Sequence, residues 1–182
     1  MLEDHGRPLQ LQTPRLTLVA CPTEFIDALA RGADEAGLLG LRLPDGWPDP
    51  ELASFLPIYA AQLRADPSML GYGVWLIVEK ETQTVIGSAG FQGKPDDGGL
   101  IEVGYGVHPD FRNAGYATEA VQALLQWARQ QEHVRGVLAH CDPDNAPSIR
   151  VLQKTGMKAT GMRGAQPEWA TNWPSNNRQR QE

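Results

Sequence analysis

The stretch "HPDFRNAGYATEAVQALLQWA", residues 108–128, decides the fold, because the chain passes there from a strand-like pattern to a helical one. It follows "LIEVGYGV" (100–107), whose apolar residues alternate as in a β-strand. After a short turn that ends in glycine (112–115), apolar residues recur with helical spacing at Ala117, Ala120, Val121, Leu124, Leu125 and Ala128. This order predicts a helix that packs on a sheet and directs its N-terminus at a potential ligand.

The segments on either side predict the rest of one sheet and its helices. We expect strands over 15–21, 74–79, 85–91, 100–107 and 134–142, weak strands over 157–163 and 167–173, and helices over 22–35, 52–66 and 145–156. Antiparallel hairpins come first and a strand–helix–strand–helix order follows. The prediction is an α/β (α+β) domain over 9–174, with a single mixed, mostly antiparallel sheet, helices on both faces and flexible termini at 1–8 and 175–182.

Composition excludes several classes of function. Of the 182 residues, 41% are hydrophobic and 21% are charged, so a packed core is expected rather than a disordered chain. The net charge of -6 argues against nucleic acid as a partner. Cys21 and Cys141 lack the spacing of a metal site, so no metal is expected. No run is long enough for a membrane span, so we expect a cytoplasmic protein without a membrane partner.

The turn before the helix has the chemistry of an anion site. The first backbone N–H groups of a helix lack partners, and the helix dipole makes that end positive. Gly115 would let a ligand approach the backbone, and Arg112 adds a positive charge, so a diphosphate would fit. The two best-known phosphate loops do not match, because Pro109 stands where the second of them needs its last glycine. Spacing alone leaves a tight turn without a ligand equally open.

Three motifs in the right order resemble the GCN5-related N-acetyltransferase (GNAT) family. "RNAGYA" (112–117) is similar to its acetyl-CoA loop, R/Q-x-x-G-x-G/A, with alanine in the last place. "NAPSIRVLQKTGM" (145–157) is similar to N-x-x-S-x-x-[VL]-[LY]-x-K-x-G-F, with methionine where phenylalanine is usual. "TPRLTLVAC" (13–21) looks like the first strand of the RimJ/RimL-like branch. The likeness covers about residues 9–165 and implies a GNAT-like acyl-CoA N-acyltransferase fold.

The resemblance also implies an activity and a set of ligand contacts. The expected enzyme is an N-acetyltransferase that moves the acetyl group of acetyl-CoA directly to a primary amine, on a small molecule or at a protein N-terminus. The alternatives are a non-catalytic acyl-CoA-binding or regulatory module of the same fold, and a bare structural domain. The residues implied to bind acetyl-CoA are Val107, Arg112, Asn113, Ala114, Gly115, Tyr116, Ala117 and Asn145.

Glu102 and Ser148 are the candidate catalytic residues. Alternation places Glu102 opposite the apolar face of its strand, beside Gly104 and Gly106, which leave room for a substrate. The family often has a glutamate base here, acting through water; the alternative is a solvated carboxylate. Ser148 would donate a proton to the thiolate, cap the helix, or do both. For Asn145 we expect ligand binding, and helix capping is the alternative. Many relatives use a tyrosine soon after this helix begins, but the chain has no tyrosine beyond Asn145.

Other residues receive weaker expectations. An acyl-cysteine route through Cys141 is disfavoured, because His140 would point to the opposite face of the strand. His108 is expected to be a loop residue, whereas Trp47 lies where the family builds its acceptor pocket. Acidic residues in 32–70 either attract a cationic amine or form a solvated surface: Asp34, Glu35, Asp45, Asp49 and Glu51. The weak terminal strands could pair with another subunit, so a homodimer is a further possibility.

Overall fold

The computed structural model describes residues 9–31 and 40–173, and the expected flexible termini lie outside the described residues. The strands are β1 (Gln10–Gln12), β2 (Leu16–Ala20), β3 (Val74–Glu79), β4 (Thr84–Phe91), β5 (Leu100–Val107), β6 (Gly136–His140), β7 (Lys158–Arg163) and β8 (Gln166–Ala170). The helices within these ranges are α1 (Thr23–Arg31), α3 (Pro50–Ala65), α4 (Tyr116–Gln130) and α5 (Ala146–Lys154). Every strand expected from the sequence is present, and β1 is an addition, since three residues are too short to show alternation.

All eight strands form one sheet in the order β1-β2-β3-β4-β5-β6-β8-β7. Neighbouring strands are antiparallel except β5 and β6, which are parallel and connected through α4. The prediction of a single mixed, mostly antiparallel sheet is therefore confirmed.

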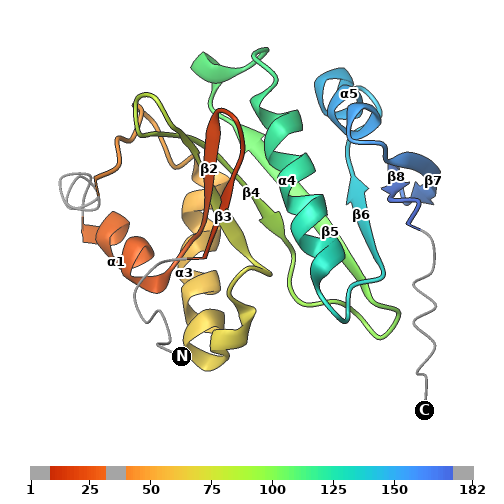
Figure 1. Ribbon diagram of the computed structural model, residues 1–182, viewed down its shortest axis with the longest axis horizontal. Coiled ribbons are helices and arrows are strands. Elements are labelled where there is room, and N and C mark those ends of the chain that lie inside the picture. Colours follow the sequence, from red (N-terminus) through yellow and green to blue (C-terminus); the bar gives the residue numbers. More distant parts are fainter. Residues whose placement is uncertain (1–8, 32–39, 174–182) are drawn as a thin grey trace.

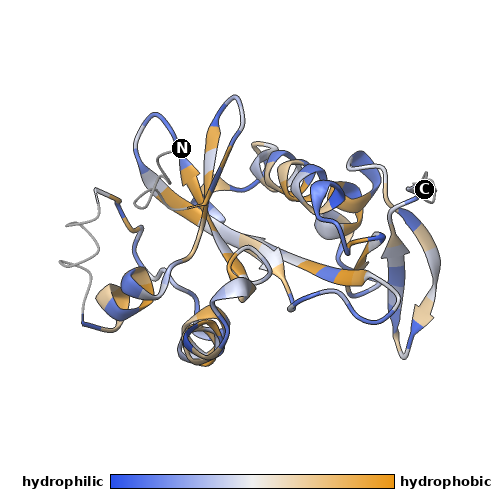
Figure 2. Cartoon of the chain, turned by 60° about the horizontal axis from the view of Figure 1, so that its bottom comes forward, coloured by the Kyte–Doolittle hydropathy of each residue, from blue (hydrophilic) through white to orange (hydrophobic). Residues whose placement is uncertain are grey.

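Helices cover both faces of the sheet, which also confirms the prediction (Figures 1 and 2). On one face α4 and α5 pack over a core that includes Trp75 and Ile77 of β3. On the other face α1 and α3 enclose a second core that includes Leu76 and Val78 of the same strand. Because β3 is buried on both sides, its sequence is a continuous apolar run and not an alternation of apolar and polar residues.

The helix α3 begins earlier than the sequence indicated. The stretch 40–51 reads as a loop, yet the helix begins at Pro50, because the Asp49 carboxylate accepts hydrogen bonds from the N–H groups of Glu51 and Leu52. Proline is favourable in the first turn, where its missing N–H needs no partner. The helix then continues through Pro57, which neither begins nor ends it.

The sheet opens between β5 and β6, and this opening positions the site. The two strands pair only from Leu100↔Gly136 to Glu102↔Leu138. Beyond Glu102, β5 continues to Val107 with partners on β4 alone. The edge of β5 that faces β6 therefore has free backbone groups along a gap, and α4 begins just after the end of β5.

Candidate active site

The loop before α4 presents an uncapped helix N-terminus. Gly115 is the N-cap residue, with φ of 81°, and no side chain caps the helix. Asn113 also has a left-handed backbone, with φ of 63°. A Cβ at Gly115 would meet nothing closer than the Arg15 guanidinium at 3.5 Å, so the glycine faces open space. The turn can thus admit an anionic group to the first N–H groups of α4.

The predicted ligand residues gather around this mouth. Tyr116 and Ala117 form the first turn of α4 and are half-buried, whereas Asn113 and Ala114 are exposed. Arg112 is exposed as well, and its Nε donates to the carbonyl oxygen of Val107 at 2.9 Å. The loop therefore bends back over the end of β5, and a positive charge lies at the mouth of the helix.

Arg15, which directly precedes β2, fixes this loop, although nothing in the local sequence around it predicts this contact. Its Nη1 donates to the carbonyl oxygen of Ala114 at 2.9 Å, and its guanidinium lies 4.4 Å from the centre of the Tyr116 ring. It also forms an ion pair with Glu119 at 2.7 Å, and Thr13 donates to the same carboxylate at 2.6 Å. Burial alone would raise the pKa of Glu119, but the bonds from Thr13 and Arg15 outweigh burial and lower it.

Asn145 and Ser148 begin α5 on the far side of the gap. Asn145 is the N-cap residue, because its Oδ1 accepts the N–H of Ser148 at 3.1 Å. Ser148 lies inside the first turn and caps nothing, so that part of its expected role is wrong. Its Oγ is instead 2.8 Å from the Tyr105 hydroxyl. Proton donation is the role that stays open for Ser148.

Tyr105 supplies the phenol that the end of the chain lacks. It extends from the free part of β5 and reaches Ser148, so two hydroxyl groups meet across the gap. Burial raises the pKa of the Tyr105 phenol, which therefore stays protonated at neutral pH. In the sequence, Tyr105 alternates with the apolar residues of its strand and carries no local mark of this contact, because its partner lies 43 residues away.

Glu102 lies on the face that alternation predicted, beside the exposed Gly104 and opposite the buried Ile101 and Val103. It is not a freely solvated carboxylate, since its side chain is 19% exposed. Three side chains hold it, two from other strands and one from the residue that directly follows β4. They are Gln92, which donates at 3.0 Å, Arg163, which donates at 3.0 Å, and His140, whose Nδ1 lies 2.9 Å from Oε1.

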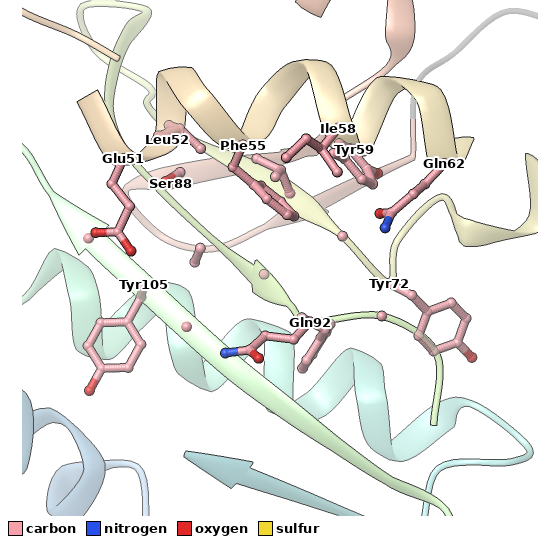
Figure 3. A pocket seen from close by; sticks show the side chains of 18 of the residues that line it. Glu51, Leu52, Phe55, Ile58, Tyr59, Gln62, Tyr72, Ser88, Gln92 and Tyr105 are labelled. Carbon is pink, nitrogen blue, oxygen red and sulfur yellow. The ribbon is translucent and has the colours of Figure 1, made fainter. Parts of the chain in front are cut away.

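A cavity of about 670 Å³ opens beside this group, between α3 and strands β3 to β5. Its floor includes Gly90, Gly104 and Gly106, which carry no side chain to fill it. The side chains of α3 form one wall (Figure 3), with Glu51, Leu52, Phe55, Ile58, Tyr59 and Gln62 along the helix. The cavity is therefore mainly apolar, with a carboxylate at the start of α3.

The remaining candidates differ in where they lie relative to this cavity. Trp47 packs against Phe25 in the second core and does not line this cavity. His108 is a loop residue, as expected, with its Nε2 3.0 Å from the carbonyl oxygen of Asp45. Asp49 and Glu51 line the cavity, whereas Asp34 and Glu35 lie outside the described residues.

Cys141 has no activating partner for covalent catalysis among the described residues. Burial raises the pKa of its thiol, which disfavours the nucleophilic thiolate. The neighbouring His140 turns to the other face and contacts Glu102 and Glu168. Residues 9–31 and 40–173 contain no group of three side chains that could hold a metal ion, and no helix in them is long and apolar enough to cross a membrane.

The chain that forms this site matches a known protein family and a related protein. The family described as Acetyltransferase (GNAT) domain matches residues 15–158. The uncharacterized N-acetyltransferase YjdG of Bacillus subtilis (strain 168) is 33% identical over 147 residues, which cover 80% of this chain and 88% of that protein. The family match includes both the loop before α4 and the start of α5.

Solved structures share the fold. RimL, the ribosomal L7/L12 alpha-N-protein acetyltransferase in complex with coenzyme A, has a TM-score of 0.64 at 18% identity, over 89% of this chain and 97% of that chain. The microcin C7 self-immunity acetyltransferase MccE, in complex with acetyl-CoA and AMP, has a TM-score of 0.61 at 15% identity, over 87% and 93% of the two chains.

Proposed function

The chain belongs to the GNAT acetyltransferase domain family, whose enzymes depend on acyl-CoA, and we propose that it transfers the acetyl group of acetyl-CoA directly to a primary amine. The observation that carries the proposal is the arrangement of two sites on the two sides of one gap in the sheet. One is the uncapped N-terminus of α4, and the other is the apolar cavity beside Glu102.

Acetyl-CoA would bind along the gap. The N–H groups at the mouth of α4, in the Arg112–Ala117 loop, would hold the diphosphate, with Arg112 contributing charge. The free edge of β5 near Val107 would bind the pantetheine arm through backbone groups. Asn145 lies on the opposite side of the gap; its Oδ1 is used in the cap, which leaves its amide N–H₂ for the ligand.

Glu102 would act as the base. The substrate ammonium loses a proton to this carboxylate, and the neutral amine attacks the thioester carbonyl carbon. A C–N bond forms and the C–S bond breaks. The thiolate of coenzyme A then takes a proton from the Tyr105 and Ser148 pair, whose hydroxyls already share a hydrogen bond. The attacking nitrogen gives up its second proton to become an amide, and a proton taken up through solvent restores the hydroxyl pair, so the protons balance. The Tyr105 phenol is protonated and half-buried, which suits a proton donor.

The acceptor is expected to carry its amine on an apolar body. Phe55 and Ile58 are exposed apolar side chains that line the cavity, and an amine with an aliphatic or aromatic part would cover them. Asp49 and Glu51 at the end of this wall would attract the positive charge of the amine before it reaches Glu102. Both a small amine and the first residues of a peptide meet this description.

The test is release of coenzyme A thiol in the presence of acetyl-CoA and a panel of amines. The panel contains apolar amines, polar amines and short peptides with free N-termini. We expect thiol release with apolar amines, and mass spectrometry should find acetyl on the amine nitrogen. Binding of acetyl-CoA without thiol release from any acceptor would favour the non-catalytic acyl-CoA-binding module. That second candidate is supported by the three side chains that already occupy the Glu102 carboxylate.

A further inference from the structure

His140, the last residue of β6, is buried between two carboxylates. Its side chain is 5% exposed. Nδ1 lies 2.9 Å from Oε1 of Glu102, and Nε2 lies 3.3 Å from Oε2 of Glu168. The bond at Nε2 is a hydrogen bond, whereas Nδ1 is close to Glu102 but out of line for one. A buried ring nitrogen without an aligned partner, beside a candidate base, requires an explanation.

The groups around this ring are few. Glu102 faces it from β5 and Glu168 from β8, and both could accept a proton from the imidazole. Arg163 of β7 supplies the nearest positive charge and bonds to the other oxygen of Glu102. Asp142, two residues along the chain, accepts from Gln166 instead. The imidazole is thus the one link between the two carboxylates that these contacts show.

The carboxylate of Glu168 is more exposed to solvent than that of Glu102. The side chain of Glu102 is 19% exposed, and that of Glu168 is 32% exposed. Thr160 donates to the other oxygen of Glu168 at 3.1 Å and so holds this carboxylate in its partly exposed position. A proton that reaches Glu168 can therefore pass to water more readily than a proton that stays on Glu102.

We propose that His140 is a positioning residue that orients Glu102 and carries the proton which Glu102 removes from the acceptor amine to Glu168. The inference rests on the proposed function. One proton moves from the Glu102 carboxyl to Nδ1 of the imidazole while the proton on Nε2 moves to the Glu168 carboxylate. The ring then returns to its first tautomer by exchange with water. The step is balanced and needs no further reactant, and it resets Glu102 as a carboxylate for the next turnover.

Nuclear magnetic resonance tests the connection without turnover. Ring ¹⁵N signals show which nitrogen of a histidine carries a proton. We expect Glu102→Gln to move the Nδ1 signal of His140 and Glu168→Gln to move its Nε2 signal. His108, which contacts Asp45 in a distant loop, serves as the internal control and should not respond. Unmoved His140 signals in both variants would overturn the proposal.

Kinetics then separate the relay from a purely structural role. Glutamine keeps an amide N–H₂ that can donate to one of the carboxylates but cannot pass a proton, so His140→Gln should lower kcat about tenfold while the acetyl-CoA KM stays unchanged. Added imidazole should restore part of the kcat of His140→Ala. If His140→Gln retains wild-type kcat, the relay is wrong and the proposed function stands. If the wild type releases no thiol with any amine, the relay falls with the proposed function, whatever the ring signals show.

Discussion

The loop before α4 and the group of side chains around Glu102 lie on the same gap in the sheet, but they are built in opposite ways. The loop is six consecutive residues whose backbone is proposed to bind the ligand, and Arg15 supports it from a distant part of the sequence. The group takes one side chain from each of four strands, namely Glu102, His140, Arg163 and Glu168, and a fifth from Gln92, which directly follows β4. A site formed by the backbone of consecutive residues can be recognised in a sequence. A site formed by side chains from several strands cannot, because it depends on how the strands pair.

The largest effect is expected at the centre of the second region. Glu102→Gln keeps the shape of the side chain and removes its basicity, so kcat should fall about 100-fold or more. Acetyl-CoA affinity should hardly change, because the proposed diphosphate site is at the N-terminus of α4 and not at Glu102. Glu81→Gln, in an exposed turn, is the matched control for loss of one carboxylate. Unchanged turnover in Glu102→Gln, measured by thiol release at saturating acetyl-CoA, would remove Glu102 as the base.

The hydroxyl pair across the gap should have the next effect. Tyr105→Phe removes the phenol but keeps the ring, and we expect kcat to fall about tenfold. Ser148→Ala should cost less, and the double variant should lose less than the product of the two, because the hydroxyls act together. Tyr72→Phe, at the other end of the cavity, is the matched control (Figure 3). Fully multiplicative losses, or no loss in Tyr105→Phe, would contradict a shared donor.

The cavity wall should affect the acceptor alone. Phe55→Ala removes apolar surface worth about 1 kcal/mol of contact, so the acceptor KM should rise about fivefold with unchanged acetyl-CoA KM. Met162→Ala removes a more exposed apolar side chain of β7, which lies outside the cavity, and should change neither constant. A rise in the acetyl-CoA KM of Phe55→Ala instead would place the acceptor elsewhere.

The smallest effect concerns the support of the loop. Since the folded pKa of Glu119 is lowered, its contribution to stability is present above its unfolded pKa of about 4.3 and is lost as the pH falls through the folded value. Glu119→Gln should therefore lower the free energy of unfolding by about 1 kcal/mol at pH 7.

Denaturant unfolding of the wild type and Glu119→Gln across pH measures this difference. It should shrink steadily as the solution becomes more acidic than pH 4. A difference that is the same at pH 7 and at pH 3 would show that the Arg15 and Thr13 contacts do not hold an ionised carboxylate.

Local patterns predicted most of the fold. Alternation located the strands around the site and placed Glu102 on the correct face, because a period of two needs only neighbouring residues. The start of α3 was missed, because a stretch rich in glycine, proline and aspartate looks like a loop until the Asp49 cap is in place.

The candidate site was predicted only where it consists of residues that are close together in the sequence. The Arg112–Ala117 loop and the cap at Asn145 could be read from consecutive residues. Ser148 was found, but its partner Tyr105 was not, because their contact depends on where β5 and α5 lie in space. His140 was considered only beside Cys141, although its contacts are with Glu102 and Glu168 from two other strands.

Calorimetry of acetyl-CoA binding tests the central claim most directly, with Gly115→Ala and Gly164→Ala compared with the wild type. Both glycines have a left-handed backbone, with φ of 81° and 62°, and a Cβ at either position would meet no atom closer than 3.5 Å, so the conformational cost of alanine is similar. Only Gly115 lies at the mouth of α4. The account predicts binding by the wild type, about tenfold weaker binding by Gly115→Ala and unchanged binding by Gly164→Ala. A folded wild type that binds no acetyl-CoA, or equal affinity in all three proteins, would contradict it.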